Sequence, residues 1–223
     1  MPEAIDTQVF DLELLLSSHG ASSELYGQIK RVIDVVGASA LLLLTAPLML
    51  LIALIVRLTS RGTAFFVQPR IGYHCREFRM YKFRTMVDGA HRAERSLAHA
   101  DGTGVFLKLA DDPRVTWFGK LLRKTSLDEL PQLANVLKGE MSLVGPRPLL
   151  LSDFEKFPRS AQMKRFCMQP GLTGLWQVSG RSMCADVERI RLDSEYVENW
   201  SLRLDVKILL KTVPVVLSGY GAT

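Results

Sequence analysis

The heptapeptide Ser-Leu-Asp-Glu-Leu-Pro-Gln, residues 126–132, places two adjacent carboxylates where a helix should begin. Pro131 is tolerated in the first turn of a helix but not further in, so we expect the helix to start close to Asp128. A helix start carries unpaired N–H groups and the positive end of the dipole. Asp128 should therefore stay ionised, and an anion such as a diphosphate could bind nearby. The alternative is a capping box, with Ser126 as the cap and Glu129 reaching back to it.

A β-rich stretch over residues 62–86 precedes this acidic pair and carries two cations. Because side chains alternate along a strand, Lys82 and Arg84 should lie on one face of an extended segment. Two neighbouring cations could bind a phosphate group together. The alternative is an ordinary solvated strand face.

Three further cations flank the acidic pair. Arg123 comes just before it, and Arg147 lies in the turn 144–148, where two prolines hold the backbone rigid. A fixed guanidinium suits two-point recognition of a phosphate, although the turn could also be purely structural. Arg181 is a candidate for a third phosphate-facing cation in this half of the chain.

The composition indicates a protein that needs a place for apolar surface and an anionic partner. The chain has 223 residues, of which 48% are hydrophobic, and its formal net charge is +5. Such a balance suits anionic lipid or a phosphorylated substrate. Nucleic acid is the least favoured partner, because no recognised binding motif accompanies the charge. Three widely spaced cysteines make no disulfide framework or metal site, so we interpret them as reduced thiols.

A membrane segment follows an acidic N-terminal tail, residues 1–27, which lacks the basic start of a signal peptide. Residues 35–56 carry no charge and would reach roughly 33 Å as one straight helix, against a bilayer core of about 30 Å. Pro47 falls inside this stretch and should bend it. Both flanks are basic, which favours the cytoplasm for both ends. The sequence alone leaves two topologies open for residues 28–60, a re-entrant helical hairpin and a kinked span, because proline is also common in spanning helices.

The remainder, residues 61–223, is expected to form a small cytoplasmic catalytic domain of mixed α/β, mainly helical structure. Helical composition marks residues 88–100 and 149–167. Residues 186–217 should also be helical, with Pro214 interrupting, and they combine a basic stripe with an apolar side. Such an amphipathic helix can lie flat in the headgroup layer or dock on the core as a surface helix. Trp176 could face the membrane interface or the core.

Five motifs in this order resemble one family. Besides the heptapeptide they are Lys-Phe-Arg-Thr-Met (82–86), Asp-Asp-Pro-Arg-Val-Thr (111–116), Gly-Glu-Met-Ser-Leu-Val-Gly-Pro-Arg-Pro (139–148) and Pro-Gly-Leu-Thr-Gly-Leu-Trp (170–176). From about residue 30 to the C-terminus, the chain resembles the bacterial sugar transferases, monotopic phosphoglycosyl transferases that start exopolysaccharide and glycan assembly. The resemblance implies a re-entrant hairpin bent at Pro47, on the cytoplasmic face of the bacterial inner membrane. The short chain resembles the exopolysaccharide-initiating forms.

The resemblance also implies a reaction. A sugar-1-phosphate would pass from a UDP-sugar to polyprenyl (undecaprenyl) phosphate, with release of UMP and a covalent aspartyl-phosphosugar intermediate. Asp128 matches the nucleophile and Glu129 the second member of the dyad, while Mg²⁺ would bind directly to Asp128. Residues 198–202 resemble members that transfer hexose phosphates. The candidate phosphate contacts are Lys82, Arg84, Arg123, Arg147 and Arg181.

Two other functions stay open at this point. One is a glycosyltransferase that uses Glu129 as a general base and releases UDP without a covalent step. The other is a membrane assembly protein that binds anionic membrane lipid and a partner but performs no chemistry. The resemblance leaves a homodimer open, since no interface can be identified in the sequence.

Overall fold

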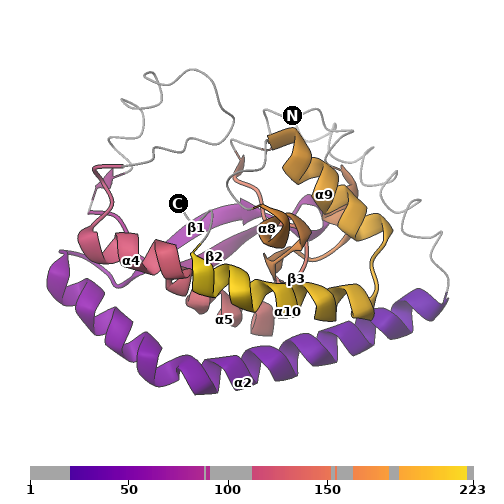
Figure 1. The fold of residues 1–223 in the computed structure, drawn as a ribbon, viewed down its shortest axis with the longest axis horizontal. Helices are drawn as coiled ribbons and strands as arrows, with labels where there is room; N and C mark the ends of the chain where they lie inside the picture. The colour runs from indigo at the N-terminus through magenta and orange to yellow at the C-terminus, as the bar shows by residue number, and fades with distance from the viewer. Residues whose placement is uncertain are drawn as a thin grey trace.

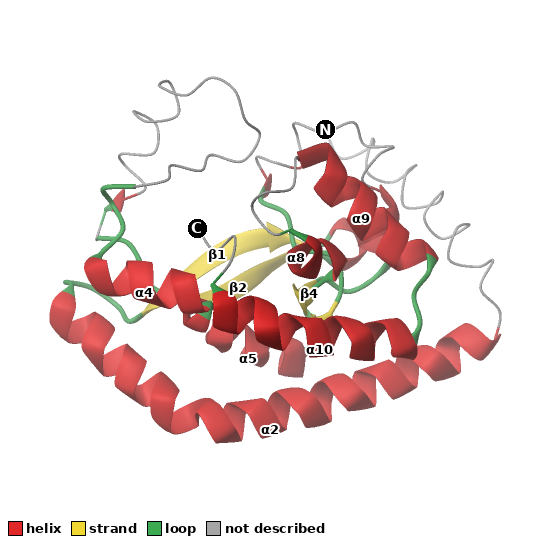
Figure 2. Ribbon diagram, viewed as in Figure 1, coloured by secondary structure: helices red, strands yellow, loops and turns green. Residues whose placement is uncertain are grey.

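The computed structural model describes residues 21–87, 89–90, 112–151, 154, 163–180 and 186–219. This part of the chain is mainly helical, as expected from the sequence, and it contains two small sheets, of which the sequence predicted only the one in residues 62–86 (Figure 2). The longer elements, in chain order, are α2 (Ala21–Thr59), β1 (Phe65–Ile71), β2 (Glu77–Phe83), α4 (Trp117–Thr125), α5 (Leu133–Lys138), α9 (Asp186–Glu198) and α10 (Leu202–Ser218). The shorter ones are the 3₁₀ helices η1 (Tyr73–Cys75), η2 (Leu127–Gln132) and η3 (Met163–Cys167), the strands β3 (Ser142–Val144) and β4 (Gly171–Thr173), and α8 (Leu175–Ser179).

The two sheets bring the site motifs together. β1 and β2 form an antiparallel hairpin whose register runs from Phe65 opposite Phe83 to Ile71 opposite Glu77. β3 pairs in parallel with β4, with Val144 opposite Thr173. The hairpin confirms the predicted β structure upstream of the acidic pair. The short parallel pair places the loop after β3 beside the chain that leads into α8.

Helix α2 dominates the shape of the molecule and passes along one side of the remaining chain with a bend (Figure 1). Among the described residues it is the one helix with the length and apolar character needed to cross a membrane. The expected break at Pro47 is a bend within a continuous helix, because a proline removes a single backbone hydrogen bond. The helix begins at Ala21, earlier than expected, since a lone exposed glycine such as Gly27 costs only about 1 kcal/mol. Residues 1–20 of the predicted tail lie outside the described residues.

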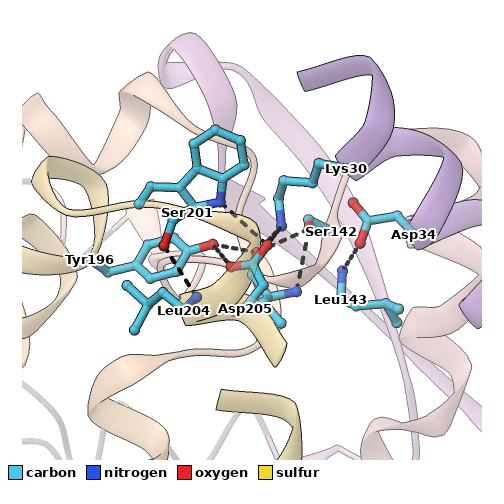
Figure 3. A network of polar contacts seen from close by, with 10 residues as sticks. Lys30, Asp34, Ser142, Leu143, Tyr196, Ser201, Leu204 and Asp205 are labelled. Atoms are coloured by element: carbon cyan, nitrogen blue, oxygen red, sulfur yellow. Dashed lines mark hydrogen bonds and ion pairs between the residues drawn. The ribbon is translucent and has the colours of Figure 1, made fainter. Parts of the chain in front are cut away.

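The N-terminal arm of α2 is fixed by a buried polar network (Figure 3). Lys30 Nζ lies 2.6 Å from Asp205 Oδ2 on α10 and donates to the Val144 carbonyl at 3.0 Å. The Tyr196 hydroxyl donates to Asp205 Oδ1 at 2.7 Å. One turn along α2, Asp34 Oδ1 accepts a hydrogen bond from the Leu143 N–H at 2.9 Å. Lys30 and Asp34, two of the charged residues of this largely apolar helix, therefore have partners in the body of the protein.

The C-terminal arm of α2 returns to the same body through apolar contacts. Ile52 and Val56 are buried in one cluster with Phe83, Phe118 and Leu122. The leucines around the bend are exposed instead, with Leu43 and Leu44 at 79% and 77% of their accessible surface. Both arms of the helix are therefore attached to one body, while its apolar middle faces outward.

Helix α10 has an apolar stripe that faces away from the body. Asp205 and Ile208 are buried, whereas Val206, Leu210, Val213 and Leu217 are all more than half exposed. Pro214 lies inside the helix and does not end it, contrary to expectation. A helix that merely docks on the core buries its apolar stripe, so the exposed stripe favours the interfacial alternative.

Three further sequence expectations have separate outcomes. Trp176 is buried, so the structure favours its core alternative over a membrane interface. Leu149 pairs with Ile71 in an antiparallel bridge instead of opening a helix, because its N–H and C=O both bond to that strand residue. The helix expected over 88–100 lies outside the described residues except at its first positions, and 149–167 is described only in part, including η3.

Candidate active site

The acidic pair lies on η2, directly after a sharp turn at the end of α4. Ser126 adopts a left-handed conformation with φ 56° and closes α4, so the chain changes direction before Asp128. η2 then leads into α5 at Leu133, with Pro131 inside it. The expected helix start near Asp128 is confirmed as a tight 3₁₀ turn. Ser126 makes no side-chain capping hydrogen bond, and the Glu129 carboxylate points to cations elsewhere, so the capping-box alternative is wrong.

Glu129 is held by two of the predicted cations. Lys82 Nζ donates to Glu129 Oε1 at 2.8 Å, and Arg147 Nη2 donates to the same oxygen at 3.0 Å. Burial alone would raise the pKa of Glu129, but these two positive charges hold it well below its usual range. Glu129 is therefore a permanent anion that joins the β-hairpin to the loop after β3.

Asp128 has the opposite character. Its carboxylate is buried and accepts no hydrogen bond from any residue that the structure describes. Burial is the main cause that raises the pKa of Asp128 to about 6; the neighbouring Glu129 carboxylate adds to this effect, and the positive charge of Lys82 opposes it. The sequence predicted that Asp128 stays ionised, and the raised pKa leaves that prediction standing at neutral pH. At neutral pH it is still largely ionised.

Arg123 approaches Asp128 from α4. Its Nε donates to the Thr85 hydroxyl at 3.0 Å, and burial lowers the pKa of the guanidinium while the Asp128 charge raises it. Thr85 was missed by sequence reasoning, although it lies in the 82–86 motif between two cations that were named. Its hydroxyl holds the base of the Arg123 guanidinium and leaves the two terminal nitrogens for another acceptor.

Arg84 lies apart from this cluster. β2 ends at Phe83, and the Arg84 guanidinium donates to the Ser60 carbonyl near the end of α2 at 2.8 Å. The expected pair of neighbouring phosphate contacts is therefore divided, because strand alternation no longer governs a residue beyond the strand. A role for Arg84 in substrate binding stays a prediction. Arg181, the last predicted phosphate contact, lies outside the described residues.

The loop that carries Arg147 is packed tightly against its neighbours. A Cβ atom on Gly145 would lie 2.4 Å from the Gln169 carbonyl oxygen, so only glycine allows this approach. The Arg147 guanidinium lies 5.8 Å from the centroid of the Trp176 ring, and Arg189 on α9 lies 5.1 Å from that centroid. Trp176 thus has cation–π partners from two elements. The importance of Arg189 could not be predicted, because it comes from a helix with no recognisable site motif.

The arrangement suits chemistry on a highly charged phosphate. A desolvated carboxylate that accepts no hydrogen bond from the described residues lies among Lys82, Arg123 and Arg147, whose charges can offset those of a diphosphate. The described residues contain no group of three or more His, Cys, Asp or Glu side chains that could hold a metal by themselves. The cluster around Asp128 and Glu129 is therefore the candidate active site of the described chain.

Comparison with known proteins identifies the family. The model of the bacterial sugar transferase family matches residues 25–219, and the chain belongs to that family. It is 42% identical over 208 residues to the exopolysaccharide production protein ExoY of Rhizobium meliloti, covering 91% of this chain and 92% of that protein. It is 47% identical over 195 residues to the galactosyl transferase CpsE of Streptococcus agalactiae, covering 86% of this chain and 43% of the relative.

A third relative is the undecaprenyl-phosphate galactose phosphotransferase of Salmonella typhimurium, which is 44% identical over 201 residues. The alignment covers 87% of this chain and 41% of that protein. The chain thus spans less than half the length of two of these relatives and almost the whole of the third.

Proposed function

We propose that this protein transfers a hexose-1-phosphate from a UDP-sugar to undecaprenyl phosphate and releases UMP. The observation that carries the proposal is the Asp128 carboxylate, which is desolvated, accepts no hydrogen bond from the described residues, and has three cations around it. A carboxylate in this state is available to attack phosphorus, because no hydrogen bond has to be broken first. The names of the relatives, which include galactose transferases and an undecaprenyl-phosphate phosphotransferase, support the substrates.

The reaction proceeds in two displacements at the same phosphorus. Asp128 Oδ attacks the β-phosphorus of the UDP-sugar, the bond to the bridging oxygen breaks, and UMP leaves. The phosphosugar is then held on Asp128 as an acyl phosphate. An oxygen of the lipid phosphate attacks that phosphorus, the acyl–phosphate bond breaks, and the carboxylate is restored. One phosphoanhydride replaces another, so no outside energy source is required.

The cations have separate tasks in this scheme. Glu129 binds both Arg147 and Lys82, so these two cations keep fixed positions and can stabilise the negative charge of the diphosphate. Arg123 approaches from α4 on a different element and offsets the charge of Asp128. Glu129 is too acidic to take up a proton at neutral pH, so its role is to position Lys82 and Arg147. This argues against a glycosyltransferase in which Glu129 acts as the general base.

Mg²⁺ fits this site. It requires only one or two carboxylates together with substrate phosphates, and the Asp128 carboxylate has coordination positions free of hydrogen bonds from the described residues. When bound, the ion would neutralise charge on the diphosphate. Asp128 is the residue that would hold it.

The enzyme works at the cytoplasmic face of the bacterial inner membrane, with α2 entering and leaving by the same side. A spanning helix would separate its ends by about 30 Å of hydrocarbon. Lys30 on one arm and Val56 on the other both contact the same body, which supports re-entry. The exposed leucines near the bend supply the apolar surface that enters lipid.

The apolar stripe of α10 is expected to lie in the headgroup layer. With the native cysteines replaced by serine, bimane attached at Leu210→Cys or Leu217→Cys should be strongly quenched by lipids with a nitroxide at the headgroup. Bimane at Lys164→Cys, an exposed polar position on η3, is the control and should stay unquenched. Equal quenching at all three positions, or none at α10, would contradict this placement.

The nucleotide released by the enzyme tests the reaction. Purified protein in nanodiscs receives Mg²⁺ and UDP-galactose or UDP-glucose, without lipid acceptor, and intact mass is recorded beside free nucleotide. The proposal expects a hexose-phosphate adduct together with one equivalent of UMP. Release of UDP would identify a glycosyltransferase, and absence of any product with a full panel of UDP-sugars would leave only the assembly function.

The pH dependence of UMP release reports the ionisation of Asp128. A protonated carboxyl is not a nucleophile, and the folded pKa is about 6, so the single-turnover rate of UMP release should fall as pH drops through 6. Below about pH 5 the fall should approach tenfold per pH unit. Omitting the lipid acceptor removes the titration of its phosphate from the profile. A rate that is flat between pH 5 and 8 would contradict Asp128 as the group that attacks.

A further inference from the structure

A buried ion pair lies behind the active site and takes no part in the chemistry proposed above. Arg165 on η3 donates through Nη2 to Asp193 Oδ2 on α9, and their side chains are 4% and 0% exposed. Removing two charges from water is costly, and well-packed apolar residues often serve stability equally well. The position of this pair therefore requires an explanation other than stability.

The pair holds the backbone of Arg147. Arg165 Nη2, which contacts Asp193, also donates to the Arg147 carbonyl at 2.9 Å. Burial raises the pKa of Asp193 to about 6, while the Arg165 charge and the Arg147 backbone N–H both lower it. Arg165 therefore contacts the carbonyl of Arg147, and Asp193 holds the Arg165 guanidinium at that carbonyl.

The loop around Arg147 is rigid, so holding its backbone also limits where the Arg147 side chain can lie. Pro146 and Pro148 restrict the backbone on both sides. The Gly171 N–H donates to the Pro146 carbonyl at 2.8 Å, which ties the loop to β4. With the backbone fixed, only rotations of the Arg147 side chain can move its guanidinium. The guanidinium is further restrained by its hydrogen bond to Glu129 Oε1 and by its position near the Trp176 ring.

We propose that Arg165 and Asp193 are positioning residues that set the Arg147 guanidinium against Glu129 and the diphosphate of the donor. The proposal rests on the proposed function, in which Arg147 contacts that diphosphate. Active-site groups must be held within about 0.5 Å of their working geometry, and an error of 1 Å can cost about 100-fold in rate. The hydrogen bond from Arg165 to the Arg147 carbonyl, with Asp193 fixing the Arg165 guanidinium, supplies such precision at a residue that comes from a loop.

A neighbouring ion pair provides a matched control. Lys164 on η3 and Glu198 on α9 join the same two elements as Arg165 and Asp193. Their side chains are half exposed and lie at the surface. Breaking this outer pair therefore loosens the same contact between η3 and α9 while leaving the Arg147 backbone held.

The test is a double-mutant cycle on the full-length protein in nanodiscs, with the rate of UMP release from UDP-sugar as readout. Arg165→Lys in the natural background should slow the reaction about 10- to 100-fold. In an Arg147→Ala background the same substitution should change the remaining rate by less than about threefold, because no guanidinium is left to position. Asp193→Asn, which keeps the side-chain volume, should behave in the same way, and Lys164→Met should change neither background.

The cycle separates the alternatives. A purely structural role for the pair would lower the rate by the same factor with and without Arg147, and such additivity overturns the proposal. An equal loss from Lys164→Met would overturn it too. If the unsubstituted enzyme releases no UMP, the proposed function itself fails, which is a distinct result. Thermal unfolding identifies variants that lose the fold, and Asp193→Asn then replaces Arg165→Lys in the cycle.

Discussion

Asp128→Asn is expected to abolish both UMP release and the hexose-phosphate adduct, with a loss of at least about 10³-fold in rate. The amide has nearly the volume of the carboxylate, but it cannot attack phosphorus. Intact mass and free nucleotide, measured with and without the lipid acceptor, check this result.

The stability of the same variant supplies the control. The pKa of Asp128 is about 6 in the folded protein and 3.8 for the ordinary carboxyl, so the fold disfavours its charge. That cost grows as pH rises from about 4 through 6 and is fully present at neutral pH. Asp128→Asn removes the charge, so its melting temperature at pH 7 should equal or exceed that of the natural protein. Lost activity with a preserved fold identifies a chemical role, whereas UMP release at the natural rate would exclude Asp128 as the nucleophile.

Asp205→Asn is expected to cause the largest loss of stability. The substitution leaves the buried Lys30 ammonium without its carboxylate, and breaking one side of a buried ion pair costs about 3–5 kcal/mol. For a chain of this size, that corresponds to a fall in melting temperature of about 6–20 °C. Thermal unfolding in detergent or nanodiscs measures the change.

A surface ion pair gives the comparison for this variant. Glu198→Gln removes one member of the exposed pair with Lys164 and should cost less than about 1 kcal/mol. Equal melting temperatures for the Asp205 and Glu198 variants would mean that the Lys30–Asp205 contact does not hold α2 to the body.

Local patterns were sufficient to predict several parts of the structure. The β-hairpin, the helix start at the acidic pair, the long apolar helix and the helical C-terminal segment all follow from periodicity or from residues close in sequence. The cations Lys82, Arg123 and Arg147 lie around the acidic pair, as the sequence motifs that contain them predicted.

The remaining features depend on packing between distant segments. Strand alternation put Arg84 beside Lys82, but the strand ends one residue too early for this rule to hold. The raised pKa of Asp128 could not be predicted from the helix dipole, because it results from burial, and burial is a property of the whole fold. The positioning role proposed for Asp193 could not be predicted from the sequence either. That role depends on contacts among Asp193, Arg165 and the Arg147 backbone, which belong to different elements.

The attachment of α2 also has a consequence for how the chain is made. Lys30 and Asp205 are 175 positions apart, and ribosomes add about 5–20 residues per second, so Lys30 emerges about 10–35 s before its partner. During that interval Lys30 and Asp34, four residues apart on one helix, can offset each other's charge. The arrival of α10 then exchanges this temporary pairing for the permanent network. A chain that stops before residue 205 therefore lacks the Lys30–Asp205 contact and has only the earlier partners of α2, such as the Leu143 N–H at Asp34 and the cluster around Ile52 and Val56.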